Sequence, residues 1–210
     1  MTGYMGTAYT ALKLAQEVKK MVNVEYKHFD INQAATDVPG TGGRVCINQI
    51  IQGSRDIERN GDQVKTVSVL VNAMLTANAN SVTSQVVKVA LLLVTHQDDT
   101  NNAISSAITP EQGIWDTDYV TALRSKESSG RNRYILLWEK NITLAPYGQA
   151  GDRHLLKEFK KFENGLKSNY RSSTTEVPRK GSLWLVYVGS KYTDNYPQIQ
   201  YSTRVTFLDN

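Results

Sequence analysis

The chain has 210 residues, of which 40% are hydrophobic and 21% are charged, and its formal net charge is +4 at pH 7. This balance is ordinary for a folded domain and argues against a disordered chain. One cysteine excludes an intrachain disulfide and a cysteine-based zinc site, and no apolar run reaches the ~18 residues needed to span a bilayer.

The first predicted element is an amphipathic helix over residues 8–22. Apolar residues recur there at the i, i+3, i+4 and i+7 spacing of one helix face, while Lys13 and Lys20 lie on the other side. An ordinary helix packed on its own domain gives this pattern, and so does a helix whose lysines contact DNA.

Period-two alternation and short apolar runs between turn signals predict the β-strands. The two clearest mid-chain strands are residues 64–75, which follow the turn signal Asn60-Gly61, and residues 86–95. The final strand, residues 198–207, alternates apolar and polar side chains without error. We expect 64–75 to pair with 86–95 as a hairpin, because only a short polar loop separates them. The other predicted strands are residues 24–29, 45–51, 134–140 and 183–188.

Residues 155–166 allow two interpretations. Leu155, Phe159 and Phe162 have helical spacing, and a strand would turn Phe162 away from the other two. Asn164-Gly165 is a hairpin signal as well as a possible end of a helix. The local pattern favours a helix, whereas the family resemblance given below favours a strand, and we adopt the strand.

About eight β segments with turns between them predict an all-β fold with one domain. We expect an eight-stranded antiparallel jelly-roll sandwich with an N-terminal helix and short helical insertions in loops. The insertions are expected near Ile104 and at residues 119–124.

Several segments resemble the jelly-roll capsid proteins of circular, Rep-encoding single-stranded DNA viruses (circovirus-like). They occur in the family's order and cover nearly the whole chain. The first segment resembles the family's junction between a helix end and the first strand. The second resembles its Gln-Gly segment followed by a long strand, and the other three resemble later strands. The matching segments are Lys19 to Lys27, Gln49 to Leu75, Val87 to Val94, Arg133 to Lys140 and Val205 to Asn210.

The resemblance implies a helical arm at residues 1–23 and a shell domain at residues 24–210. It implies a homo-oligomeric icosahedral shell around circular single-stranded DNA, with no enzymatic activity and no cofactor. A host-cell receptor would bind the outer loops, no membrane would be involved, and the protein would occur in the virion and in the host nucleus during assembly. Family members usually begin with a long Arg/Lys-rich arm, whereas no basic residue precedes Lys13 here.

Two basic groups are candidates for nucleic-acid contacts, because phosphate contacts are sequence-blind and need only cations. The first group is favoured, since the resemblance places that end inside the shell; it is Lys13, Lys19, Lys20 and Lys27. Phe159 and Tyr170 are interleaved with the second group and could stack on bases, but we interpret this group as a solvated outer surface. It comprises Lys157, Lys160, Lys161, Lys167 and Arg171.

Residues that could carry other chemistry are scattered. The histidines His28, His96 and His154 have no metal-binding partner at helical spacing, and a cupin-like enzyme would need clustered His and Glu ligands. Aspartates at 98, 99, 116 and 118 are interpreted as solvated loop carboxylates in preference to a cation site between subunits.

An alternative to a capsid subunit is a non-enzymatic jelly-roll carbohydrate-binding module with a tryptophan as stacking platform. Its candidates are Trp115, Trp138 and Trp184, of which the last two lie in apolar strands and are better explained as core. Cys46 is predicted to be a small buried hydrophobe. The first residues lack the layout of a secretory signal, so we expect synthesis in a reducing, intracellular compartment.

Overall fold

The structure is a computed structural model that describes residues 26–95, 134–171, 177–190 and 194–209. The described part consists of eight β-strands, so the prediction of an all-β fold with about eight strands is confirmed for these residues. The helix expected at residues 8–22 and the helical turns expected near Ile104 and at 119–124 lie outside the described residues.

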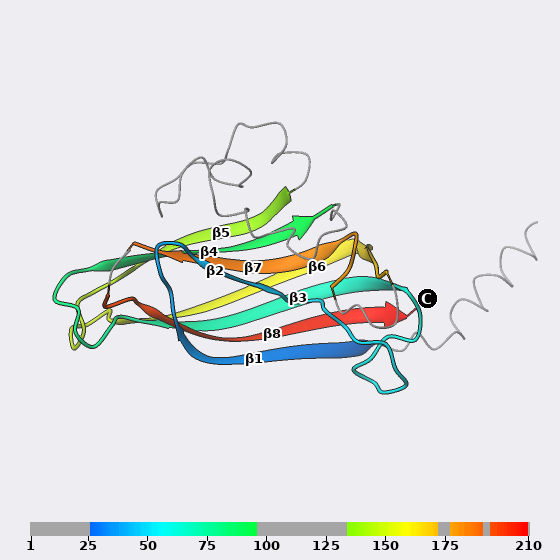
Figure 1. The fold of residues 1–210 in the computed structure, drawn as a ribbon, viewed down its shortest axis with the longest axis horizontal. Coiled ribbons are helices and arrows are strands. Elements are labelled where there is room, and N and C mark those ends of the chain that lie inside the picture. Colours follow the sequence, from blue (N-terminus) through cyan, green and yellow to red (C-terminus); the bar gives the residue numbers. More distant parts are fainter. Residues whose placement is uncertain (1–25, 96–133, 172–176, 191–193, 210) are drawn as a thin grey trace, which may run out of the picture.

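The strands form two four-stranded antiparallel sheets, which appear in Figure 1 as a lower and an upper layer with strands along the long axis of the molecule. The first sheet has the order β1-β8-β3-β6, with β1 Lys27–Asp37, β8 Gln198–Asp209, β3 Gln63–Thr76 and β6 Arg153–Asn169. The second sheet has the order β2-β7-β4-β5, with β2 Gly43–Cys46, β7 Ser182–Gly189, β4 Gln85–Val94 and β5 Tyr134–Leu144.

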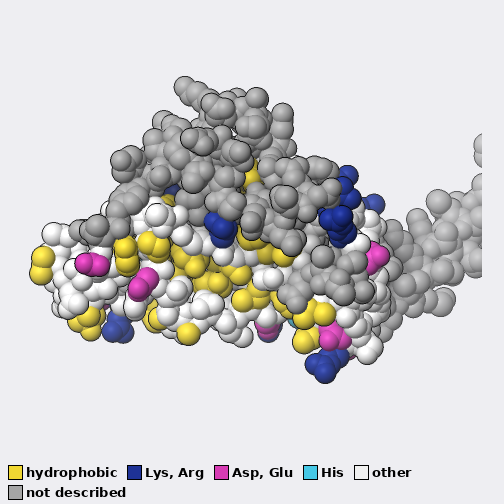
Figure 2. Space-filling view, viewed as in Figure 1, with side chains coloured by type: hydrophobic (Ala, Val, Ile, Leu, Met, Phe, Trp, Pro, Cys, Tyr) yellow, Lys and Arg dark blue, Asp and Glu magenta, His cyan; other side chains and the backbone are white. Residues whose placement is uncertain are grey.

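The main hydrophobic core fills the space between the two sheets. Alternate residues of each strand face it, as the period-two pattern predicts. On the side drawn in Figure 2, hydrophobic side chains form a band along the middle of the described part. The fully buried members include Val71 and Leu75 of β3, Val89 and Leu91 of β4, and Val205 of β8.

A second apolar cluster lies on the outer face of the second sheet. Ala90, Leu92 and Val94 alternate with the core-facing residues of β4, and Val186 and Val188 alternate with those of β7. Both faces of β4 are therefore buried, which explains why its sequence is an almost continuous apolar run.

The predicted hairpin of residues 64–75 and 86–95 is wrong. β3 pairs with β6 and β8 in the first sheet, whereas β4 pairs with β5 and β7 in the second. A short polar loop is compatible with a hairpin and equally with a crossing between stacked sheets, so the loop alone does not decide the pairing.

Residues 153–169 form strand β6, as adopted from the family resemblance, and the helical pattern of this segment is misleading. Leu155 and Phe159 point to solvent, with 74% and 62% of their surfaces exposed, while Leu156 is buried. The signal Asn164-Gly165 marks a β-bulge, where the register of β3 and β6 shifts and Gly165 takes a φ of 67°. It is neither a hairpin turn nor a helix end.

The predicted ends of two other strands also differ from the structure. β1 continues to Asp37, beyond its expected end at residue 29, and β2 is only four residues long. Ile47 and Ile50 were expected in that strand; they are fully buried but belong to the following loop. They were predicted as strand residues because an apolar run indicates that residues are buried, but not whether they form a strand or a loop.

Candidate functional site

Of the four lysines first considered for nucleic-acid binding, Lys13, Lys19 and Lys20 lie outside the described residues. Lys27 lies at the start of β1 with its side chain 10% exposed. Its ammonium is 2.7 Å from the Asp209 carboxylate and donates a hydrogen bond to the Glu58 carbonyl at 3.0 Å. The charge of Lys27 is thus compensated inside the protein, and a phosphate contact would have to compete with this ion pair.

A buried polar network closes the end of the sandwich near the loop of residues 47–62. The Asn48 side chain donates to the Ser168 hydroxyl at 3.1 Å and to the Gly181 carbonyl at 2.9 Å, and it accepts from the Leu183 amide at 2.8 Å. The Tyr170 hydroxyl donates to the Asn48 carbonyl at 2.7 Å. Tyr170 is therefore a buried structural residue and does not offer its ring to a base.

Cys46 belongs to the same region and is buried, as predicted. Burial raises the pKa of its thiol to about 12. The thiol thus stays protonated at neutral pH, and a protonated buried thiol is a poor nucleophile.

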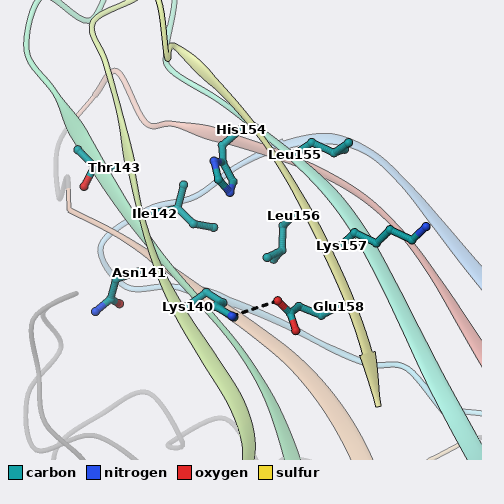
Figure 3. Close-up of a pocket in the computed structure, with 9 residues that line it drawn as sticks. All are labelled: Lys140, Asn141, Ile142, Thr143, His154, Leu155, Leu156, Lys157 and Glu158. Atoms are coloured by element: carbon teal, nitrogen blue, oxygen red, sulfur yellow. Dashed lines mark ion pairs between the residues drawn. The ribbon is translucent and has the colours of Figure 1, made fainter. Parts of the chain in front are cut away.

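A hollow of about 440 Å³ lies between the edge strands of the two sheets, β5 and β6. Figure 3 shows Lys140 and Ile142 of β5 pointing toward His154, Leu156 and Glu158 of β6. Lys140 and Glu158 form an ion pair of 3.2 Å across it. The hollow thus lies where two sheet edges without a strand partner run beside each other. The charges of Lys140 and Glu158 neutralise one another there.

The described histidines and tryptophans are separated from one another. His28 lies on the outer face of the first sheet, 3.2 Å from the Thr206 hydroxyl, whereas His154 lines the hollow between β5 and β6. Trp138 packs against the main core and Trp184 against the second apolar cluster. Neither ring is placed as an open stacking platform for a sugar.

The outer face of the first sheet carries Lys157 and Lys161 of the second basic group, whereas Lys160 alternates with them and Arg171 lies beyond the end of β6. Residues two apart on a strand share a face, so Arg153, Leu155, Lys157, Phe159 and Lys161 of β6 all point outward, and all five are exposed. We call these five residues the β6 row.

The neighbouring strands continue this outer face. Phe159 stands opposite Leu70 of β3, Lys157 opposite Asn72 and Leu155 opposite Met74. Beyond β3, polar side chains of β8 complete the surface, and they include Gln200, Ser202 and Arg204.

The sequence names Phe159 as a ring that could stack on bases, but the helical spacing of this segment does not place it on one face with Lys157 and Lys161. On a helix, Lys157 and Lys161 share a face and Phe159 lies away from them, whereas on a strand the three share one face. Once residues 153–169 are taken as a strand, the alternation Lys-Glu-Phe-Lys-Lys itself places a phenyl ring between two lysines.

Among the residues that the structure describes, no helix is long and apolar enough to cross a membrane, and no group of three or more His, Cys, Asp or Glu side chains could hold a metal ion.

Comparison with known proteins adds little. No protein-family model matches the chain, and no curated protein matches it. Among solved structures, a chain from Desmodium yellow mottle tymovirus matches with a TM-score of 0.35 and 9% sequence identity, covering 88% of this chain and 87% of that one. A likeness this weak carries no argument about function.

Proposed function

We propose that this chain is the subunit of a viral capsid and that its sandwich is a jelly roll. The strand order carries the proposal: 1-8-3-6 in one sheet and 2-7-4-5 in the other. Consecutive strands lie in different sheets at every step except β4 to β5, which are neighbours in the second sheet. This is the arrangement of two interleaved Greek keys, and viral shells are a major use of that architecture.

The family resemblance supports the same proposal at particular places. The segments that resemble circovirus-like capsid proteins fall on β3, β4, β5 and β8, with the Gln-Gly turn in the loop before β3. These strands include the centre and one edge of the second sheet and the centre of the first, so the resemblance involves the whole sandwich.

In its finer form, the proposal is a non-enzymatic subunit that assembles into an icosahedral shell around circular single-stranded DNA through sequence-blind basic contacts. The virion and, during assembly, the host nucleus would be its locations, and outer loops would bind a host receptor. Long edge strands favour assembly, because the outer edges of β5 and β6 leave backbone groups without a strand partner within their own sheets.

Electron microscopy of the purified chain tests the proposal. We expect closed particles of uniform diameter, and we expect nucleic acid extracted from them after nuclease treatment of the outside to be degraded by a single-strand-specific DNase. A chain that stays monomeric across pH, salt and concentration would contradict the proposal. Binding of such a monomer to a glycan would favour the carbohydrate-binding alternative.

A further inference from the structure

We propose that the outer face of the first sheet binds single-stranded nucleic acid, with Phe159 stacking on a base and Arg153, Lys157 and Lys161 contacting phosphates. This inference deepens the proposed function and rests on it in one respect, since it assigns the wall of the shell that would contact the genome. It moves the expected contact from the N-terminal lysines to β6.

The cations of the β6 row are available to a ligand. The side chains of Arg153, Lys157 and Lys161 are exposed, and none makes an ion pair with a carboxylate among the described residues. Outward residues four apart on a strand lie about 13 Å from one another, so the three cations form a line along the sheet edge. Such a line can follow a polyanion, whereas an isolated cation cannot.

The carboxylates of this face lie mainly at its other edge. Asp30 and Asp37 belong to β1, which is separated from β6 by β8 and β3. Asp30 is neutralised by Arg204, whose guanidinium donates two hydrogen bonds to it at 2.8 and 2.6 Å. Along β6 itself, Glu158 lies on the opposite face and pairs with Lys140, and Glu163 lies in the bulge beyond Lys161. The β6 side of the face is therefore locally positive.

The exposed Phe159 ring indicates which kind of partner would bind to this positive surface. Its ring is 62% exposed in the middle of a strand, between two lysines that share its face. Binding sites for single strands combine a basic groove with an exposed aromatic side chain, and every base has a face that can stack on it. The buried centre of a contact between protein copies is depleted in lysine, so lysines on both sides of the ring favour nucleic acid over a second subunit.

The surface next to Phe159 is hollowed and polar. Two shallow hollows of about 200 and 240 Å³ meet at Asn72 and Ser202, and the first also includes Gln200. These three side chains have no hydrogen-bond partner among the described residues, so they can bond to a sugar or to a base edge. A duplex keeps its bases paired and stacked, so the aromatic platform specifies an unpaired strand.

Fluorescence anisotropy with a fluorescein-labelled 20-nucleotide oligo(dT) tests this inference on the purified full-length chain. We expect Phe159→Leu, which keeps an apolar side chain, to weaken binding about five-fold or more. Its matched control is Tyr147→Leu, which removes an exposed aromatic ring from the loop between β5 and β6 and should leave binding within two-fold.

The salt dependence tests the lysines separately. Replacing Lys157 and Lys161 together by Gln should reduce the slope of log K against log salt by about 1.4, since each contact with a single strand contributes roughly 0.7. The control Arg55→Gln with Lys180→Gln removes the same charge elsewhere and should leave the slope within about 0.3 of the wild-type value. A duplex of equal length should show no loss with Phe159→Leu.

The outcomes separate this inference from the proposed function, provided that particles are counted by electron microscopy on the same samples. Wild-type affinity in Phe159→Leu and in the double lysine variant overturns the inference, whether or not particles form. Loss of particles with unchanged oligo(dT) affinity in Phe159→Leu identifies the face as a contact between copies and also overturns it. A wild-type chain that never assembles, yet binds oligo(dT) through these residues, upholds the inference and contradicts the shell.

Discussion

At the scale of single residues, Arg59 joins the loop of residues 47–62 to the body of the sandwich. Its fully buried guanidinium stacks on the Tyr170 ring, 4.2 Å from the centroid. It donates to the Ile50 carbonyl at 3.1 Å, to the Gly61 carbonyl, and to the Asp62 carboxylate at 3.2 Å. A buried cation is tolerated here because several acceptors and an aromatic face surround it.

We expect Arg59→Ala to lower the free energy of unfolding by about 3–5 kcal/mol, because it leaves buried carbonyls without donors and opens a cavity. Arg59→Lys should lose less, since it keeps the charge, yet it should still fall short of the wild type because an ammonium lacks the planar fork. Urea denaturation followed by fluorescence measures both variants. Equal stability of Arg59→Ala and the wild type would show that the loop is not anchored through this side chain.

The pair of Asp30 and Arg204 predicts a pH effect. The hydrogen bonds from Arg204 hold the pKa of the Asp30 carboxyl below its usual value of 3.8. A carboxyl whose pKa is lower in the folded protein contributes stability above its unfolded pKa, and this contribution is lost as the pH falls through the folded pKa.

Carboxyl titration by NMR should therefore find the pKa of Asp30 closer to its usual value in Arg204→Gln than in the wild type. The difference in stability between the two proteins should be constant near neutral pH and shrink below about pH 4. An unchanged pKa of Asp30 in the variant would mean that Arg204 does not hold this carboxylate in solution.

At the scale of elements, β6 shows what a sequence pattern can and cannot determine. Leu155 and Phe159 appear to belong to a buried helix face because local patterns assume that apolar residues are buried. In the structure they are exposed, so the assumption fails at these two residues of the outer face. The pattern of β8, whose outward residues are polar, is confirmed over residues 198–207, and the strand continues to Asp209.

Strand pairing was not predictable from local pattern. The alternation of β3 and the apolar run of β4 identify each as a strand, but their partners β6, β8, β5 and β7 are far away in the sequence. The placement of Lys27 was missed for the same reason, because its partner Asp209 stands at the other end of the chain. A local sequence pattern cannot reveal a contact between two residues that only the fold brings together.

The connection from β6 to β7 crosses from one sheet to the other and depends on Gly181. Its φ is 72°, and a Cβ there would collide with the backbone carbonyl of Lys167. Gly148 also has a positive φ, of 79°, but has open space around it. Substitution at Gly148 therefore measures the free-energy cost of a left-handed backbone alone. Substitution at Gly181 measures that cost together with the cost of a steric collision.

We expect Gly148→Ala to cost about 1–2 kcal/mol, since an L side chain disfavours the left-handed conformation. Gly181→Ala should cost more, because the backbone must also move and the Gly181 carbonyl accepts hydrogen bonds from Asn48 and Ser168. Thermal unfolding of the two variants under identical conditions measures the difference. Equal losses would mean that the crossing can shift without penalty.

At the scale of the whole molecule, the two sheets share a core but present different outer faces. The outer face of the second sheet is apolar and buried, with Leu92 and Val186 in its cluster. The outer face of the first sheet is polar and basic at β6, and its large apolar side chains Leu155 and Phe159 are exposed. The first face is therefore open to a partner, whereas the second contributes to the stability of the chain itself.

This difference predicts a large loss of stability for a leucine substitution on one outer face and almost none for a similar substitution on the other. Leu92→Ala should lower the free energy of unfolding by about 2–5 kcal/mol, because it empties a fully buried site. Leu155→Ala, on the outer face of the other sheet, should change it by less than about 0.5 kcal/mol, since the side chain is already 74% exposed. Urea denaturation of the unassembled chain measures both without interference from contacts between copies. A large loss for Leu155→Ala there would mean that its face is covered by the chain itself, and it would then be closed to any nucleic acid.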